Sequence, residues 1–520
     1  MDLCIKLSML IIFFAMTIGI GLYCRKHATD VNGFVLGGRS VGPWLTAFAY
    51  GTSYFSAVVF VGYAGQFGWK FGIASTWAGI GNALIGSLMA WALLGRRTRV
   101  MTQHLSSATM PQFFSARFAC PALKTASSAI IFIFLIPYTA SLYNGLSRLF
   151  GMAFDIDYSV CVIVMAVLTA VYVIAGGYMA TAINDFVQGI IMIIGIISVI
   201  AAVLKGQGGF MEALHKLAQV SDPAVSNTPG VFASFFGPDP LSLLGVVLLT
   251  SLGTWGLPQM VQKFYAIKSE QAISKGLVIS TVFAALVAGG CYFLGGFGRL
   301  FSDRVDVATQ GYDAIIPAML ADLSPLLIAV VVILVLSASM STLSSLVLTS
   351  SSTLTLDFIK GTLIKEEKMD EKKQLLIMRA LIVVFILISV ILAIIQYKSN
   401  ITFIAQLMGV SWGALAGAFL APFLYGLYSK RVSVPAVWTS FLFSTVVMLS
   451  NILVPSLFPA ALKSPINAGA FCMIAGLVLV PIVSLFTAAP DKAHVDQVFS
   501  CYDRTVTVNV TDSIGDRSED

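Results

Sequence analysis

A series of apolar runs constrains this chain more than any other feature, because a run of about 20 apolar residues crosses a bilayer as one helix. Of the 520 residues, 58% are hydrophobic and 11% are charged, whereas soluble domains carry about 25% charged residues. The sequence therefore predicts an all-α polytopic membrane protein with about 13 transmembrane helices. The expected spans are 3–23, 42–64, 72–94, 124–147, 157–178, 183–204, 241–263, 274–297, 326–355, 377–397, 402–425, 433–454 and 467–488.

No long polar insert interrupts the succession of runs, so residues 1–490 are expected to form a single transmembrane domain. Residues 491–520 are polar and end acidic, and this tail is expected to be cytoplasmic and disordered. With the N-terminus outside, the inner loops hold 19 Lys and Arg residues and the outer loops hold 8. That excess predicts a multi-pass protein of the plasma membrane with an outer N-terminus and an inner C-terminus. Its positive charge lies where anionic membrane lipid would meet it, and no nucleic-acid partner is expected.

The ninth run carries a hydroxyl-rich patch at membrane depth, within residues 337–345. Residues three and four apart share one face of a helix, which places Ala338, Ser341, Thr342 and Ser345 together. Such a row of oxygen atoms suits a small hard cation. Ser and Thr in membrane helices also bond to their own backbone or allow close helix packing, so this alternative stays open.

The second and seventh spans are both interrupted by small and polar residues, at 51–56 and at 253–259. Five spans separate one interruption from the next, which indicates two copies of a five-helix unit, with repeat one at about 42–204 and repeat two at about 241–425. An odd number of helices per copy inverts the second copy. Paired broken helices in inverted repeats point to the binding site of a transporter.

An unwound second span would free backbone carbonyls between Thr52 and Phe55. Together with the hydroxyl face of the ninth span, these carbonyls would surround an ion with oxygen atoms but no carboxylate. That donor set suits a monovalent cation, because a divalent ion usually recruits Asp or Glu.

Four segments of the chain resemble the sodium:solute symporter family, which includes proline, pantothenate, glucose and monocarboxylate carriers. They are Leu36-Gly37-Gly38-Arg39-Ser40, Gly176 to Ala180 with Asn184-Asp185 and Gln188-Gly189, Gly256-Leu257-Pro258, and Ala338 to Ser345. The resemblance covers the second to the eleventh span. It implies a LeuT-like five-plus-five inverted repeat with extra flanking helices, and a secondary active transporter that couples inward sodium movement to uptake of a small organic solute.

The resemblance also implies residue roles. The family's shared sodium site falls on the carbonyls of Thr52, Phe55 and Ala338 and on the hydroxyls of Ser341 and Thr342. Na⁺ is thus the expected coupling ion.

A second sodium site, or a relay for ion exit, falls on Asp185, Ser344 and Ser345. Asp185 could equally cap the helix that starts there. Arg39 matches a family arginine, and an ordinary inside-positive anchor explains it as well.

For the solute, the resemblance points to Ser56, Tyr138, Trp255 and Pro258. Tyr138 could also be an ordinary core tyrosine. Helix N-termini at the breaks favour a carboxylate, such as pantothenate, proline or a monocarboxylate.

Two positions depart from the family pattern. Val58 stands where proline carriers have a tryptophan, and Lys263 stands where arginine is frequent. The residues around Ser56 are more similar to the pantothenate branch.

Other functions are disfavoured by what the sequence contains. The four His residues are far apart, which leaves no catalytic cluster for an enzyme. A channel would call for a repeated pore loop. A proton-coupled or sodium-independent exchanger on the same fold would call for a cation such as Lys in place of the hydroxyl pair Ser341 and Thr342.

Overall fold

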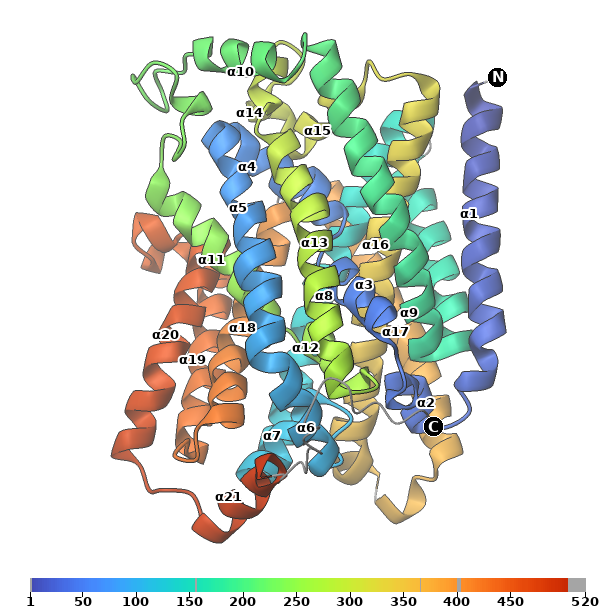
Figure 1. The fold of residues 1–520 in the computed structure, drawn as a ribbon, viewed down its shortest axis with the longest axis vertical. Helices are drawn as coiled ribbons and strands as arrows, with labels where there is room; N and C mark the ends of the chain where they lie inside the picture. Colours follow the sequence, from blue (N-terminus) through green and yellow to red (C-terminus); the bar gives the residue numbers. More distant parts are fainter. Residues whose placement is uncertain (1, 155–156, 365, 400–403, 504–520) are drawn as a thin grey trace, which may run out of the picture.

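The computed structural model describes residues 2–154, 157–364, 366–399 and 404–503. Within these ranges the chain forms helices and no β-strand, which confirms the all-α class. The long helices run along the long axis of the molecule (Figure 1). The start of α1 lies at the same end as α10 and α14, and α6, α7 and α21 lie at the opposite end (Figure 1).

The helices have the following bounds. The long ones are α1 (Asp2–Cys24), α8 (Pro121–Phe154), α9 (Tyr158–Gly206), α11 (Pro240–Gly256), α13 (Glu270–Gly295), α16 (Pro325–Thr353), α17 (Glu371–Ser399), α18 (Ile404–Tyr428), α19 (Val434–Leu453) and α20 (Pro465–Phe486). The short ones are α2 (Val31–Leu36), α3 (Pro43–Thr52), α4 (Ala64–Phe71), α5 (Thr76–Gly81), α6 (Arg96–His104), α7 (Met110–Phe118), α10 (Phe210–Gln219), α12 (Pro258–Ala266), α14 (Val307–Gln310), α15 (Ile315–Leu320) and α21 (Lys492–Phe499). Wider π-helical turns cover Val58–Tyr63, Asn82–Met89, Trp91–Gly95 and Leu354–Leu363.

The expected count of 13 spans does not match a simple count of helices. Ten helical stretches of the described chain are long and apolar enough to cross a membrane, or 11 when the bent pair α11 and α12 is counted as one. Two of these stretches, Val58–His104 with 47 residues and Tyr158–Gly206 with 49, are more than twice the length that a bilayer needs. Each of them contains a reversal of the chain, so each holds parts of two expected spans.

The reversal within α9 lies at Gly177, and contacts with α1 show it. Tyr172 packs against Gly21 and Gly176 against Cys24, but Asn184 donates a hydrogen bond back to the carbonyl of Thr17. The residues before Gly177 therefore run parallel to α1, and the residues after it run antiparallel to α1. Gly177 has φ 53° and ψ −146°, a conformation that glycine adopts without steric cost.

A second reversal lies at Gly72, where φ is 61°. Here α13 serves as the reference. Gly51 packs on Phe283 and Gly68 on Gly295, whereas further along the chain Ser75 bonds to Tyr292 and Ser87 to Ser280. The second and third spans therefore lie against α13 in opposite directions.

Both predicted interruptions are present. Helix α3 ends at Thr52, residues 53–56 are not helical, and the helix resumes before Val58. Helices α11 and α12 meet at Leu257 with a bend of 46°.

The centre of the bundle is α16, in which every residue from Val331 to Thr353 is buried. Apolar side chains such as Ile12, Ile194 and Ile388 are exposed on α1, α9 and α17. That distribution is typical of a protein whose outer helices face lipid.

The polar tail differs from expectation at its start. Residues 492–499 form α21, which is capped by Asp491 and packs at the end of the molecule that holds α6 and α7. The His494 ring lies 3.0 Å from the carbonyl of Ala116, and Lys430 pairs with Asp496 at 2.8 Å. These contacts order a segment that composition alone marks as disordered. Residues 504–520 of the expected tail lie outside the described residues.

Candidate functional site

The hydroxyl face of α16 lies directly against the break after α3. The Thr342 hydroxyl is 3.0 Å from the carbonyl oxygen of Thr52, 3.2 Å from that of Phe55 and 3.1 Å from that of Ala338. The Ser341 hydroxyl is 3.3 Å from the Thr52 carbonyl and 3.1 Å from the Ala338 carbonyl. The structure thus brings together all five groups that the sequence analysis assigned to sodium, from elements almost 290 residues apart.

The chemistry of this cluster fits a monovalent cation. Its five oxygens are three carbonyls and two hydroxyls, and none of them carries a formal charge. All five residues are at most 1% exposed. Carbonyls at a helix break need partners in a membrane, and here the hydroxyls supply them.

Deeper in the bundle lies a second polar cluster, with Asp185, Ser344 and Ser345. The Ser344 hydroxyl donates to the carbonyl of Ser341 at 2.9 Å. The Ser345 hydroxyl lies 2.9 Å from the hydroxyl of Ser53, in the broken part of the second span. Asp185 is fully buried in the interior of α9, so it does not cap a helix start.

Lys263 is one of the 19 Lys and Arg residues that the sequence analysis counts as inner-loop charges, and the structure corrects that assignment. Its side chain is 2% exposed on α12, and its ammonium donates to the Ser345 hydroxyl at 3.0 Å. Tertiary packing of α12 against α16 places it there. The only sequence signal was that Lys263 stands at a position where the family often has arginine.

Two of the predicted solute residues form one wall. Tyr138 follows Pro137 in α8, and its ring stands edge-on to that of Trp412 with 6.0 Å between centroids. The Tyr138 hydroxyl faces Ser56 and the indole N–H of Trp412 without a full hydrogen bond to either. Trp412 was missed by the sequence analysis, because it lies within a uniform apolar run.

The other two residues lie at the break of the seventh span. Pro258 is the first residue of α12. Trp255, in the last turn of α11, donates its indole N–H to the carbonyl of Ile85 at 2.9 Å. Trp412 connects Tyr138 with the break of the seventh span, because its ring also packs against Gly253.

Several buried polar side chains along the second, third and seventh spans, and in α8 and α18, have atoms without a hydrogen-bond partner among the described residues. They are Thr52, Tyr54, Tyr63, Gln66, Asn82, Tyr138, Gln259 and Trp412. Buried polar groups normally find partners, so a set of unpaired donors and acceptors is typical of a site for a polar ligand.

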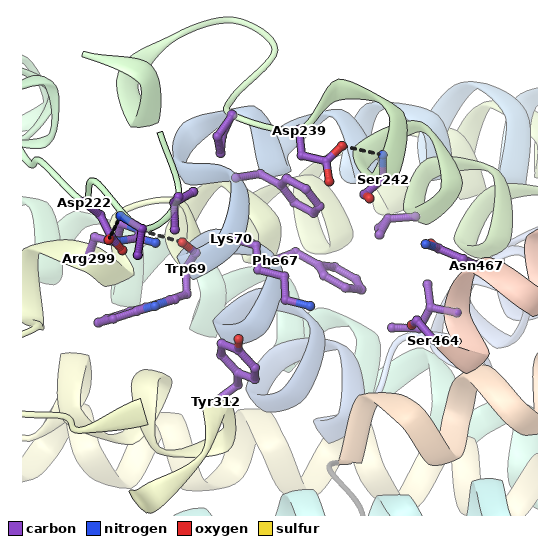
Figure 2. A pocket seen from close by; sticks show the side chains of 16 residues that line it. Phe67, Trp69, Lys70, Asp222, Asp239, Ser242, Arg299, Tyr312, Ser464 and Asn467 are labelled. Carbon is purple, nitrogen blue, oxygen red and sulfur yellow. Dashed lines mark hydrogen bonds and ion pairs between the residues drawn. The ribbon is translucent and has the colours of Figure 1, made fainter. Parts of the chain in front are cut away.

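A cavity of 440 Å³ opens at the end of the molecule that holds α10 (Figure 2). It is lined by α4, the start of α11 and the segments around Asp222 and Tyr312. The Lys70 side chain points toward Tyr312, with its ammonium 5.4 Å from the ring centroid. Arg299 donates to the Trp69 carbonyl at 2.6 Å and pairs with Asp222 at 2.9 Å (Figure 2).

At the opposite end, Arg39 holds three elements together. It donates to the carbonyl of Ser107, after α6, at 2.6 Å and to that of Tyr265, in α12, at 3.2 Å. Burial, with a further contribution from Arg99, lowers the pKa of Arg39 to about 10, so the side chain stays protonated at neutral pH. Arg39 therefore links the segment after α6 with α12, in addition to contributing a positive charge.

Comparison with known proteins agrees with this architecture. A family model described as the sodium:solute symporter family matches residues 34–442. The chain is 29% identical to the osmoregulated proline transporter of Bacillus subtilis over 95% of this chain and 97% of that protein. It is 30% identical to a sodium/proline symporter of Staphylococcus aureus over 82% of this chain and 81% of that protein.

Solved structures show the same fold. A Na⁺-coupled sialic acid symporter superimposes with a TM-score of 0.73 at 16% identity and covers 94% of this chain and 98% of its own. A manganese transporter of Eremococcus coleocola reaches 0.50 at 11% identity, over 90% and 96% of the two chains. The expected LeuT-like fold is confirmed. The chain belongs to the sodium:solute symporter family and is a multi-pass membrane transporter, not an enzyme, that couples sodium movement to uptake of a small organic solute.

Proposed function

We propose that the coupling sodium ion binds between the break after α3 and the hydroxyl face of α16. Its ligands are the carbonyls of Thr52, Phe55 and Ala338 and the hydroxyls of Ser341 and Thr342. The observation that carries the proposal is the position of the Thr342 hydroxyl, which lies within 3.2 Å of all three carbonyls.

Sodium at this position acts as a removable link between α3 and α16. Bound from the outside, it holds the broken span in the shape that receives the solute. When the bundle rocks to open inward, the link loosens and the ion leaves. Coupling is reciprocal, so sodium raises solute affinity by the same factor by which solute raises sodium affinity. The coupling free energy is typically about 1–3 kcal/mol.

The test is the double variant Ser341→Ala with Thr342→Ala, purified and reconstituted into proteoliposomes. Losing two of five ligands should raise the sodium concentration needed for half-maximal uptake by about tenfold or more, since a hydrogen bond or contact to a charged group contributes about 1.5–3 kcal/mol. Ser339→Ala is the matched control, because Ser339 is buried in the same helix and its hydroxyl has no partner among the described residues. Unchanged sodium dependence of the double variant would refute the site.

For the solute, we infer a zwitterionic amino acid with proline as the first candidate. The relatives reported above are named as proline transporters. Tyr138 and Trp412 carry polar atoms without a hydrogen-bond partner among the described residues. The break before α12 offers a helix N-terminus to a carboxylate. Val58 stands where proline carriers have a tryptophan, so this region is wider because a large side chain is absent.

Competition identifies the solute. Sodium-driven uptake of labelled L-proline into proteoliposomes should be inhibited by excess unlabelled proline, and much less by pantothenate or a monocarboxylate. Sodium-driven uptake of labelled pantothenate, with no uptake of L-proline, would place the chain in the pantothenate branch that its residues around Ser56 resemble.

We also propose that residues 42–204 and 241–425 are the inverted repeats within one domain at 1–490, and that the protein lies in the plasma membrane with its N-terminus outside. Breaks at Thr52 and Leu257, five spans apart, support the repeats. The Lys and Arg excess supports the orientation, even without Lys263. An epitope added after Asp520 should bind antibody only after cells are permeabilised, and binding on intact cells would reverse the orientation.

A further inference from the structure

We propose that the ammonium of Lys263 is the fixed cation of the second polar cluster, formed by Asp185, Ser344 and Ser345, and that it takes the place of a second sodium ion. The protein would then bind one sodium ion per chain. This inference rests on the proposed sodium site at Ser341 and Thr342, and it concerns the cluster next to that site.

Hydrogen bonds tie Lys263 into the cluster. Its ammonium lies 3.0 Å from the Ser345 hydroxyl, which lies 2.9 Å from the Ser53 hydroxyl. Ser53 in turn donates to the carbonyl of Ala49 at 2.5 Å. Lys263 therefore connects α12 with α16 and with the broken part of the second span.

The charge of Asp185 supports the same placement of Lys263. Asp185 is fully buried, and neither of its carboxylate oxygens has a hydrogen-bond partner among the described residues. Among those residues, Lys263 is the one ionisable cation that acts on Asp185, and Asp185 the one ionisable anion that acts on Lys263. A bare carboxylate inside a membrane is very unfavourable, and a neighbouring cation lowers that cost.

A third contact fixes the direction of the lysine. Its ammonium stands 5.0 Å from the ring centroid of Tyr178, in the turn that follows Gly177. A cation over an aromatic face is attracted by the electrons of the ring. The ammonium is thus enclosed by a hydroxyl, an aromatic ring and the field of a carboxylate.

The consequence for ion binding follows from repulsion between like charges. A sodium ion that used Ser345 and Asp185 would have to lie close to an ammonium that already occupies the Ser345 hydroxyl. The site at Ser341 and Thr342 does not have this conflict, because its hydroxyls bond to carbonyls and not to Lys263. One sodium site stays open and the other is filled by the protein itself.

The experiment is equilibrium binding of ²²Na⁺ to the purified full-length protein, which needs no solute. The wild type should bind one ion per chain. Lys263→Met, which keeps an unbranched side chain of nearly the same length but removes its charge, should bind two. Adding Asp185→Asn to that variant should return the value to one, because the carboxylate that attracts the second ion is gone.

Two results would overturn the inference: two ions bound by the wild type, or one ion bound by Lys263→Met. Ser345→Ala tests it independently if Lys263→Met does not fold. With lysine as the cation, Ser345→Ala leaves sodium affinity within about twofold, whereas loss of a sodium ligand lowers it tenfold or more. Failure of the proposed function looks different, because the Ser341→Ala, Thr342→Ala variant would then bind sodium as the wild type does.

Discussion

Individual residues at the site were predictable where chemistry and spacing coincide. Ser341 and Thr342 were identified because their hydroxyls share one helix face and because the family resemblance assigns both to the sodium site. Lys263 and Trp412 were not, because their roles come from packing between helices distant in sequence. A sodium-independent exchanger would have a lysine in place of the hydroxyl pair Ser341 and Thr342. Here Lys263 bonds to Ser345 instead, so the two hydroxyls remain available to bind sodium.

One prediction concerns the solute wall. Trp412→Phe keeps a ring against Tyr138 but removes the indole N–H. If that group binds the solute carboxylate, the L-proline concentration for half-maximal uptake should rise about tenfold, since hydrogen bonds to charged groups contribute about 1.5–3 kcal/mol. Binding of ²²Na⁺ without proline should not change, because Trp412 is not among the sodium ligands. Trp438→Phe, on α19, is the control, and an equal effect there would count against the assignment.

At the scale of elements, the sequence located most spans and both breaks, because runs of apolar residues and interruptions within them are local signals. The number of continuous helical stretches differs from the 13 expected spans because the helical pattern continues on both sides of Gly72 and Gly177, where the chain reverses. Helix α21 was missed because it is stabilised by contacts with the end of the bundle that holds α6 and α7 and not by its own composition.

A partly buried ion pair fixes the segment around Asp222 to the bundle, which gives a prediction about stability. Arg299 is 5% exposed and pairs with Asp222. Asp222→Asn would leave a buried guanidinium uncompensated, and we expect the apparent Tm of the purified protein to fall by several degrees. The exposed pair of Arg304 with Asp322 is the control. Asp322→Asn should change the Tm by about 1 °C or less, because surface pairs contribute little; equal shifts would contradict the argument.

At the scale of the whole molecule, transport of one sodium ion with a zwitterion moves one net charge across the membrane. A potential of 100 mV, negative inside, contributes about 2.3 kcal/mol per charge. It should raise the steady-state accumulation of L-proline in proteoliposomes by up to about 50-fold. Potassium and valinomycin set the potential, and equal potassium on both sides is the control. No response to voltage would indicate an anionic solute, and a response near the square of this value would indicate two sodium ions.

The hydrogen bonds between the Thr342 hydroxyl and the carbonyls around it have one more consequence. Each hydroxyl can turn its proton away and offer a lone pair to an arriving ion, so loading requires rotation about a side-chain bond and no rearrangement of the backbone. After the ion departs, the same protons can cover the carbonyls again. The carrier without sodium can therefore change conformation while the hydroxyls remain hydrogen-bonded to these buried carbonyls.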